Sequence, residues 1–205
     1  MMNMLQACGV VAQQRPADSI LVATMGAMFV FDRIDAAGAP PKVASRLSSV
    51  PLMGGAAGLG LGLALAQPQR RVIVVDGDAS LLMELGSLNS VAAQAPKNLL
   101  HVVIHNGTQF TGLANIASPV RGFSFAQAAR NAGYRQAETF DQPAAWAERF
   151  AALLALDGPG FVELMVEPMP AQTGPGFEPA EMPDLQFERM GREARALQSF
   201  LKESS

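Results

Sequence analysis

Two polar loops, each following an apolar run, hold the side chains best suited to chemistry. The first covers residues 76–80 and the second residues 105–108. Within them, the carboxylate of Asp78, the amide oxygen of Asn106 and a main-chain carbonyl near Thr108 are hard oxygen donors. Mg²⁺ prefers such donors, and it keeps coordination positions for phosphate oxygens and water. The two loops therefore predict a magnesium site that also accepts a diphosphate.

The position of these loops follows from the strands that precede them. Ligands of open parallel sheets bind at the carboxyl ends of the strands, where both loops are expected to lie. A helix expected just after Ser80 would present free N–H groups and the positive end of its dipole to an anion.

Other interpretations of the first loop are weaker. Asp78 as a simple helix cap would need no ligand. An EF-hand is excluded because Leu81 stands where glycine is required and Ser87 where a bidentate glutamate is required. A dinucleotide site would use the glycines of 58–62 with Asp76 near the ribose-binding distance, but no apolar strand runs into that segment.

Alternation of short β-branched runs with longer helical patterns predicts an α/β fold, with a three-layer, doubly wound, mostly parallel sheet. The expected strands are Ile20–Thr24, Val43–Arg46, Val72–Val75, Leu100–His105, Tyr134–Ala137 and Phe161–Val166. The expected helices cover about 3–13, 26–36, 55–66, 81–94, 123–132 and 143–156.

The chain divides into three parts that differ in composition and in the pattern of apolar residues. An N-terminal helix is expected within 1–14, and the cofactor-binding α/β domain within 15–168. Residues 169–205 combine a proline-rich connector with an amphipathic helix at Leu185–Lys202. We expect this helix to be a packing arm across a subunit boundary, with a lid as the alternative.

Composition excludes several function classes. Charged residues make up 16% of the 205 residues, against about 25% in an average domain. The 15 basic and 18 acidic residues form no basic run, which argues against nucleic-acid binding. The single cysteine, Cys8, excludes an internal disulfide framework and a self-contained iron–sulfur cluster, and fits a cytoplasmic protein.

A membrane span has to be considered because residues 47–69 carry no charge. The predominantly apolar part of this run, Val50–Ala66, is at the short limit for a spanning helix and contains Pro51 and several glycines. No basic residue precedes Arg15, so a charged secretory start is missing as well. We therefore expect no membrane association.

Gly77-Asp78-Ala79-Ser80, followed after 25 residues by His105-Asn106, resembles the signature of thiamine-diphosphate enzymes. In that family an aspartate and, at about this distance, an asparagine hold the metal. The segment 53–64 resembles the part of the family that passes under the thiazolium ring, and 129–134 resembles its Ala-x-x-x-Gly-Tyr helix end. Thr24-Met25-Gly26 resembles the Thr-x-Gly beside the diphosphate in small 2-oxoacid decarboxylases.

The resemblance implies a set of site residues. Met53 would bend the cofactor into its V shape, and the carbonyl of Pro51 would meet its 4′-amino group. Asp78, Asn106 and Thr108 would bind Mg²⁺. The implied cofactor-binding residues are Thr24, Pro51, Leu52, Met53, Gly77, Asp78, Ala79, Ser80, Asn106, Thr108, Gln109, Phe110 and Thr111.

Three residues depart from the family pattern. Ala79 replaces a glycine and would resist any requirement for a positive φ. Phe110 replaces a serine before Thr111-Gly112. His105 replaces the first asparagine of the pair, where it could shuttle protons as a catalytic residue or support its neighbours.

The resemblance covers only the diphosphate-binding domain of the family. It therefore implies a separate subunit that binds the aminopyrimidine and carries the activating glutamate, with two copies of each subunit. Length and segment order are most similar to the β-type half of sulfopyruvate and phosphonopyruvate decarboxylases, which act on small 2-oxo acids. The anionic tail of such a substrate would need a cation, for which Arg33, Lys42, Arg46 and Arg121 are candidates.

Two further functions stay open. A carboligase of the acetolactate-synthase type shares the same cofactor half. A non-catalytic subunit could keep the fold as a cofactor-binding scaffold. A 2-oxoacid oxidoreductase is disfavoured because its iron–sulfur clusters need more than one cysteine.

Overall fold

Six parallel strands form the centre of the molecule. The structure is a computed structural model that describes residues 1–38, 43–49, 51–110, 115–118, 122–168 and 183–203. Thr111, Gly112, Lys42 and Arg121, and most of the connector, lie outside this part of the chain. In spatial order the strands are β2 (Arg46–Ser48), β1 (Ile20–Ala23), β3 (Val72–Gly77), β4 (Leu99–His105), β8 (Gly160–Met165) and β7 (Gln136–Phe140).

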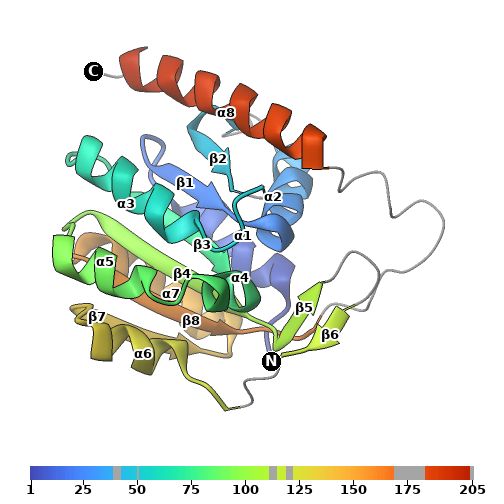
Figure 1. Cartoon of the computed structure of the whole chain (residues 1–205), viewed down its shortest axis with the longest axis vertical. Helices are drawn as coiled ribbons and strands as arrows, with labels where there is room; N and C mark the ends of the chain where they lie inside the picture. Colours follow the sequence, from blue (N-terminus) through green and yellow to red (C-terminus); the bar gives the residue numbers. More distant parts are fainter. Residues whose placement is uncertain (39–42, 50, 111–114, 119–121, 169–182, 204–205) are drawn as a thin grey trace.

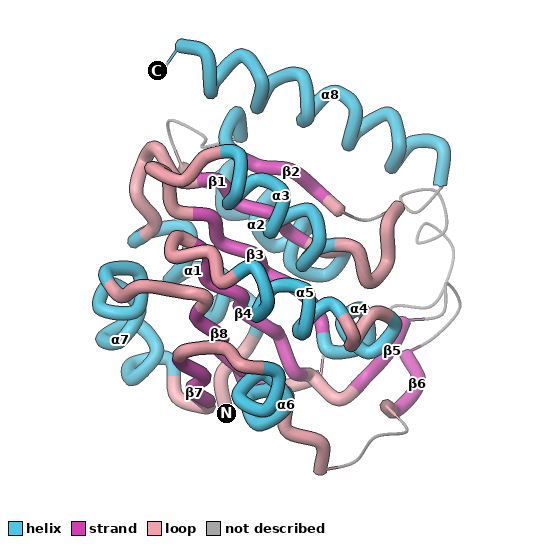
Figure 2. Tube along the Cα trace, turned by 60° about the vertical axis from the view of Figure 1, so that its left-hand side comes forward, coloured by secondary structure: helices cyan, strands magenta, loops and turns pink. Residues whose placement is uncertain are grey.

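Helices cover both faces of this sheet, which confirms the doubly wound α/β fold (Figures 1 and 2). One face carries α1 (Met4–Gln14), α2 (Met25–Ala37) and α7 (Pro143–Ala155). The other carries α3 (Ala56–Ala66), α4 (Asp78–Met83), α5 (Ser87–Gln94) and α6 (Phe125–Ala132). None of these described helices, nor α8 below, is long and apolar enough to cross a membrane.

Strand residues alternate between the two cores because successive side chains of a strand point to opposite faces. Ile73 and Val75 of β3 contact the core under α1, α2 and α7, whereas Val72 and Val74 contact the core under α3 and α5. Burial of each such side chain contributes about 1.5–3 kcal/mol. This two-sided burial explains the continuous apolar runs of the central strands.

The C-terminal helix, α8 (Pro183–Glu203), is present where a helix at 185–202 was expected. It lies along β2 and the short 3₁₀ helix at Val43–Ser45, at the top of Figure 1. Leu197 is buried in the same core as α3, and Arg70 lies 5.5 Å from the ring centre of Phe200. The helix therefore packs on the sheet of its own chain.

Some expected boundaries are wrong. The strand expected at Val43–Arg46 is a 3₁₀ turn followed by β2, and the strand expected at Tyr134–Ala137 lies at β7. The helix expected over 81–94 is two helices, α4 and α5. The C-cap of α4 is Glu84, whose φ of −133° and ψ of 45° leave the helical region, and α5 begins after Gly86.

One element was not expected at all. After β4 the chain forms an antiparallel pair, β5 (Thr108–Phe110) and β6 (Asn115–Ala117), beside the main sheet (Figure 1). Each strand has only three residues, which is too short to show a strand period. This hairpin contains Gln109 and Phe110, two of the expected cofactor-binding residues.

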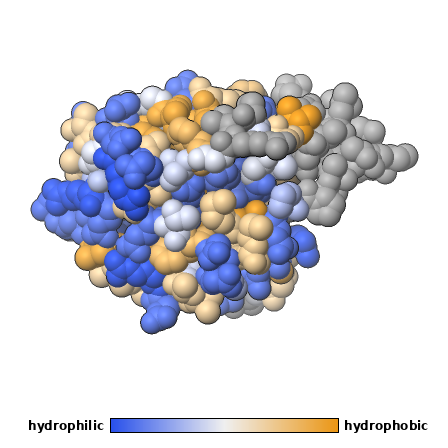
Figure 3. Space-filling view, turned by 90° about the horizontal axis from the view of Figure 1, so that it is seen from below, coloured by the Kyte–Doolittle hydropathy of each residue, from blue (hydrophilic) through white to orange (hydrophobic). Residues whose placement is uncertain are grey.

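The molecular surface mixes polar and apolar residues. Figure 3 shows a face on which hydrophilic residues surround several separate hydrophobic areas. The exposed large apolar side chains include Leu52, Met53 and Leu65, at 40%, 37% and 52%. Leu52 and Met53 matter here because they belong to the segment expected under the thiazolium ring.

Candidate functional site

The two polar loops meet through one hydrogen bond. Asp78 is the first residue of α4, directly after β3, and its side chain is buried. Its Oδ1 accepts the N–H of Ala79 at 2.8 Å, and its Oδ2 accepts the N–H of Gly107 at 2.7 Å. Gly107 has φ +68°, a backbone conformation that favours glycine. The expected juxtaposition of the loops after β3 and β4 is therefore present.

Burial dominates the electrostatics of Asp78. Desolvation raises the pKa of this carboxyl, although the N–H groups of Ala79 and Gly107 and the charge of His105 act in the opposite direction. Its position in the first turn of α4 adds the favourable end of the helix dipole. Because these groups only partly offset the cost of burying the Asp78 charge, a divalent cation beside Asp78 would stabilise the carboxylate.

The second loop is built around Asn106. Its amide oxygen accepts both the N–H and the Oγ–H of Thr108, each at 2.9 Å. These two hydrogen bonds fix the Asn106 amide oxygen within the second loop. The same loop reaches Asp78 through the N–H of Gly107. The Gly107 carbonyl in turn accepts the N–H of Ser118.

The donor set fits Mg²⁺ in chemistry. Within the described residues, no cluster contains three or more His, Cys, Asp or Glu side chains. A cation here would rely on one carboxylate, one amide oxygen and main-chain oxygens, a hard and oxygen-only set with room for diphosphate and water.

Ala79 does not require the positive φ that a glycine would permit. It lies inside α4, and in the described part of the chain only Ala95 among non-glycine residues has a positive φ. The substitution of glycine by alanine in the signature is therefore compatible with this backbone.

Ser80 connects the first loop to the glycine-rich segment. Its Oγ accepts the N–H of Gly54 at 3.1 Å, so the turn at Pro51–Gly54 lies beside the Asp78 loop. Gly54 has φ +84° and is in contact with Glu84, so both conformation and space require glycine. Leu52 and Met53 stay partly exposed on this turn, as a residue that contacts a cofactor must.

Thr24 lies beside the same site, at the end of β1. Its backbone N–H and its hydroxyl both donate to the Val75 carbonyl, at 3.0 and 3.4 Å. A Cβ on Gly77 would come within 3.9 Å of the Thr24 hydroxyl. The structure thus brings Thr24, the 51–54 turn, the Asp78 loop and the Asn106 loop to the same edge of the sheet.

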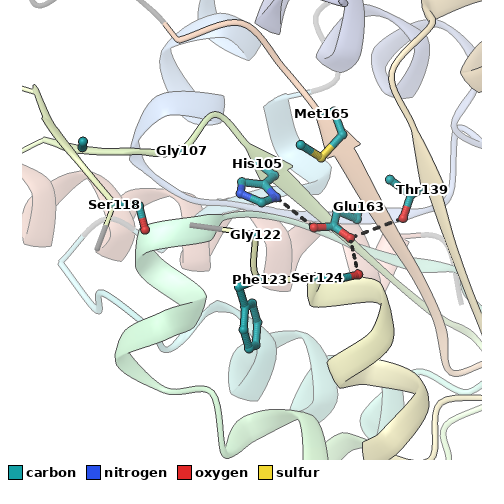
Figure 4. Close-up of a pocket in the computed structure, with 10 residues that line it drawn as sticks. His105, Gly107, Ser118, Gly122, Phe123, Ser124, Thr139, Glu163 and Met165 are labelled. Atoms are coloured by element: carbon teal, nitrogen blue, oxygen red, sulfur yellow. Dashed lines mark hydrogen bonds and ion pairs between the residues drawn. The ribbon is translucent and has the colours of Figure 1, made fainter. Parts of the chain in front are cut away.

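A pocket of about 480 Å³ opens beside His105 and Gly107 (Figure 4). His105 Nδ1 lies 2.8 Å from Glu163 Oε1, and in Figure 4 the other ring nitrogen points away from Glu163. The remaining lining residues are Ala117, Ser118, Gly122, Phe123, Ser124, Thr139 and Met165.

Glu163 organises this pocket from β8. Besides His105, its carboxylate accepts the hydroxyls of Ser124 and Thr139 at 3.1 and 3.3 Å. The first N–H groups of α6, those of Phe125 and Ala126, also donate to it, both at 3.1 Å.

Glu163 and His105 each shift the other's pKa toward the charged form. The hydrogen bond to Glu163 raises the pKa of His105, against the effect of burial. Burial would raise the pKa of Glu163, but the hydrogen bonds from His105 and from the N-terminus of α6 outweigh it and lower that pKa. Both shifts favour an imidazolium paired with a carboxylate.

Glu163 was missed in the sequence. Its signal was present, since it is the one charged residue inside the apolar run 161–166. A buried charge of this kind needs partners and is therefore informative about its surroundings.

Two of the candidate cations for a substrate tail lie elsewhere. Arg46 is buried at the start of β2, where it pairs with Asp32 and Asp35. Strand starts lie at the edge of the sheet opposite the site, so Arg46 as a substrate ligand is wrong. Arg33 is exposed on α2. His101 is a core residue that contacts Tyr134 and Phe161, as its place within a strand suggests.

Fold and site together define a doubly wound α/β protein whose carboxyl edge is suited to a divalent cation and an anion. The profile of the family described as "Thiamine pyrophosphate enzyme, C-terminal TPP binding domain" matches residues 36–164. The chain belongs to this family of thiamine pyrophosphate enzymes.

Similarity to curated proteins points to decarboxylases. Phosphonopyruvate decarboxylase of Streptomyces viridochromogenes is 42% identical over 121 residues, which are 58% of this chain and 30% of the relative. Sulfopyruvate decarboxylase subunit beta of Methanothermobacter thermautotrophicus is 39% identical over 127 residues, 57% of this chain and 59% of the relative. The chain thus spans less than two thirds of the length of either relative.

A solved structure supports the fold. The thiamine diphosphate-dependent 4-hydroxybenzoylformate decarboxylase of Rhodococcus jostii RHA1 superposes with a TM-score of 0.66 at 20% identity. The match covers 82% of this chain and 33% of that chain.

Proposed function

We propose that this chain is the diphosphate- and Mg²⁺-binding subunit of a thiamine-diphosphate-dependent 2-oxoacid decarboxylase, of the sulfopyruvate or phosphonopyruvate decarboxylase type. The observation that carries this proposal is the hydrogen bond from Gly107 to the buried Asp78, which joins the two loops of the family signature. The similarity to curated decarboxylases supports the reaction class.

Each loop has its own role in the proposal. Asp78, Asn106 and a carbonyl at Thr108 hold Mg²⁺, while Ala79 and the N–H group of Ser80, in the first turn of α4, lie beside the diphosphate. Thr24 and Gly77 line the diphosphate from β1 and β3. Gln109, Phe110 and Thr111 continue the second loop over the cofactor. The turn from Pro51 to Met53 supports the thiazolium ring, and Met53 is the residue that bends the cofactor.

When bound, thiamine diphosphate supplies an electron sink that lets a 2-oxo acid lose carbon dioxide. The chain's own groups orient the cofactor and handle protons nearby. His105 is held by Glu163 through Nδ1, so its second nitrogen is free to exchange a proton with a group in the pocket.

Further parts of the proposal concern assembly and location. The glutamate that activates the cofactor comes from a separate aminopyrimidine-binding subunit, with two copies of each subunit in a heterotetramer. The name of one relative, a subunit beta, supports the existence of a partner. A cytoplasmic location is supported by the buried free thiol of Cys8, because reducing compartments keep thiols unpaired. The cofactor-binding domain extends over about 15–168.

Cofactor binding is tested by titrating the purified chain, alone and with its partner, with thiamine diphosphate and Mg²⁺. Asp78→Ala should abolish saturable binding, whereas Asp157→Ala, a surface aspartate beside Lys97, should leave it unchanged. Equal binding by the Asp78 variant and the wild type would refute the metal site.

Identity of the reaction is tested with the reconstituted complex. Release of carbon dioxide and an aldehyde from sulfopyruvate or phosphonopyruvate is expected. A condensation product of two carbonyl compounds would instead identify a carboligase, and cofactor binding without turnover of any 2-oxo acid would identify a scaffold. A co-purifying partner of about 160–200 residues, one α/β domain, is expected.

A further inference from the structure

Helix α8 is attached to the edge of the sheet by a buried carboxylate. Glu193 accepts the backbone N–H of Ser48 and, at 3.0 Å, the Ser48 hydroxyl. It also accepts the Nε–H of Arg189 at 2.9 Å. Ser48 and Glu193 are 1% and 7% exposed, so this contact is shielded from water. Three donors converge on this carboxylate, and two of them belong to Ser48, which lies 145 positions away in the chain.

Ion pairs extend this contact into α2. Arg189 donates to both oxygens of Asp32, each at 2.8 Å, and Arg46 donates to Asp32 and to Asp35. A paired guanidinium and carboxylate have a fixed mutual orientation, which a single charge contact lacks. We call this set the α8 clamp: Asp32, Asp35, Arg46, Ser48, Arg189 and Glu193.

The clamp acts on the strand that leads into the cofactor turn. Ser48 ends β2, and Pro51 is only three residues further on. Leu52 N–H donates to the Ser49 carbonyl at 3.2 Å, so the turn folds back on the residue next to the clamp. At its far end the turn is held by a hydrogen bond of 3.1 Å that the Gly54 N–H donates to the Ser80 hydroxyl. The turn is thus anchored on one side by α8 and on the other by the Asp78 loop.

We propose that Glu193 is a positioning residue for the cofactor-binding turn at Pro51–Gly54, and that α8 is a fixed brace for it. The expected effect on cofactor binding rests on the proposed function, whereas the role of Glu193 in holding the turn does not. A lid would need a contact that opens readily, whereas removing one partner of a buried charged contact is strongly unfavourable.

A purely structural role for Glu193 makes a different prediction. If α8 only stabilises the fold, loss of Glu193 lowers the melting temperature and leaves the turn and the cofactor affinity of the folded protein unchanged. If Glu193 positions the turn, the backbone of 49–54 loosens in the folded protein and the cofactor binds more weakly.

The test compares Glu193→Gln with Glu188→Gln. Both substitutions lie on α8, but Glu188 is exposed and pairs with Arg192 on the same helix. Hydrogen exchange of peptides spanning 49–55 is measured without cofactor, and the dissociation constant of thiamine diphosphate is measured with Mg²⁺ in the assembled protein. Glu193→Gln should speed exchange in this segment and weaken cofactor binding about tenfold, the lower end of the effect of residues that support a metal site. Glu188→Gln should match the wild type in both.

Wild-type exchange and affinity in folded Glu193→Gln would overturn the inference. If the wild type binds no cofactor, the proposed function fails, and the exchange experiment still decides whether Glu193 holds the turn. If Glu193→Gln does not fold, Ser48→Ala removes only the hydroxyl bond to Glu193. Its exchange at 49–55 must then exceed that of Glu188→Gln, or the inference fails.

Discussion

Asp78 and Glu163 are two buried carboxylates near the same edge of the sheet, and the protein treats them differently. Five partners converge on Glu163, one of them the Nδ1 atom of His105. Asp78 accepts two backbone N–H groups. Accordingly, the pKa of Glu163 is lowered despite burial, and the pKa of Asp78 is raised by it.

The difference separates structure from ligand binding. A carboxylate that the protein neutralises by itself holds its neighbours in place, here α6 and His105. A buried carboxylate that the protein leaves undercompensated is unfavourable unless something else supplies a positive charge. Stability should therefore depend on Glu163, and cofactor binding on Asp78.

Loss of Glu163 has the largest expected effect on stability. Glu163→Gln removes the charge and leaves His105 and the α6 N–H groups short of their partner, so the free energy of unfolding should fall by about 3–5 kcal/mol. Urea denaturation measures it. The control is Glu138→Gln on neighbouring β7, whose solvent-exposed pair with Arg149 should contribute far less to stability. Equal losses in the two variants would contradict the comparison.

Acid should erase this stability difference. The folded-state pKa of Glu163 lies below its ordinary value of 4.5. The contribution of the carboxylate is therefore complete above pH 4.5 and is lost as the pH falls through the lowered pKa. Unfolding curves of wild type and Glu163→Gln, recorded from pH 6 downwards, should converge. A constant difference down to the acid limit would show that charge is not its source.

Loss of the Asp78 charge should have the reverse profile. Asp78→Asn keeps the shape but removes a charged metal ligand, so the affinity for Mg²⁺ and thiamine diphosphate should fall about 100-fold. The free energy of unfolding of the free chain should change by no more than about 1 kcal/mol, the value of one hydrogen bond. Calorimetric titration and urea denaturation provide the two numbers. A stability loss as large as that of Glu163→Gln would remove the distinction between the two carboxylates.

The smallest effect is expected for a single donor to Glu163. Thr139→Val removes one hydroxyl of similar shape and should lower stability by about 1 kcal/mol, with no change in cofactor affinity. Chemical denaturation detects the first effect and titration the second. A change in affinity would mean that the β7 side of the pocket reaches the cofactor.

Sequence patterns were informative where a loop with distinctive polar side chains directly follows a strand with a clear apolar pattern. The loops at 76–80 and 105–108 could be placed together because both follow strongly apolar strands, and parallel strands end at a common edge. The central strands β3 and β4 were predicted for the same reason. At these positions one local signal was enough.

Other features depend on contacts between residues far apart in the chain, which the periodicity of a short segment does not reveal. The contact of Glu84 with Gly54 joins residues 30 positions apart, and the break between α4 and α5 falls within an apolar pattern that continues through Leu85. The Glu193 contact with Ser48 joins segments 145 positions apart. Glu163 was visible as a charge in an apolar strand, but its five partners come from three different segments, the end of β4, the start of α6 and β7.

Strand order has a consequence for how small a working fragment can be. The family profile begins at residue 36, yet β1, which lies between β2 and β3, ends at Ala23. A fragment of 36–164 would leave a gap two strand spacings wide, about 9.6 Å, between β2 and the rest of the sheet. It would also lack α8 and its contact with Ser48. The segment that the family profile matches is therefore smaller than the unit that folds, and expression of that segment alone would divide a single sheet.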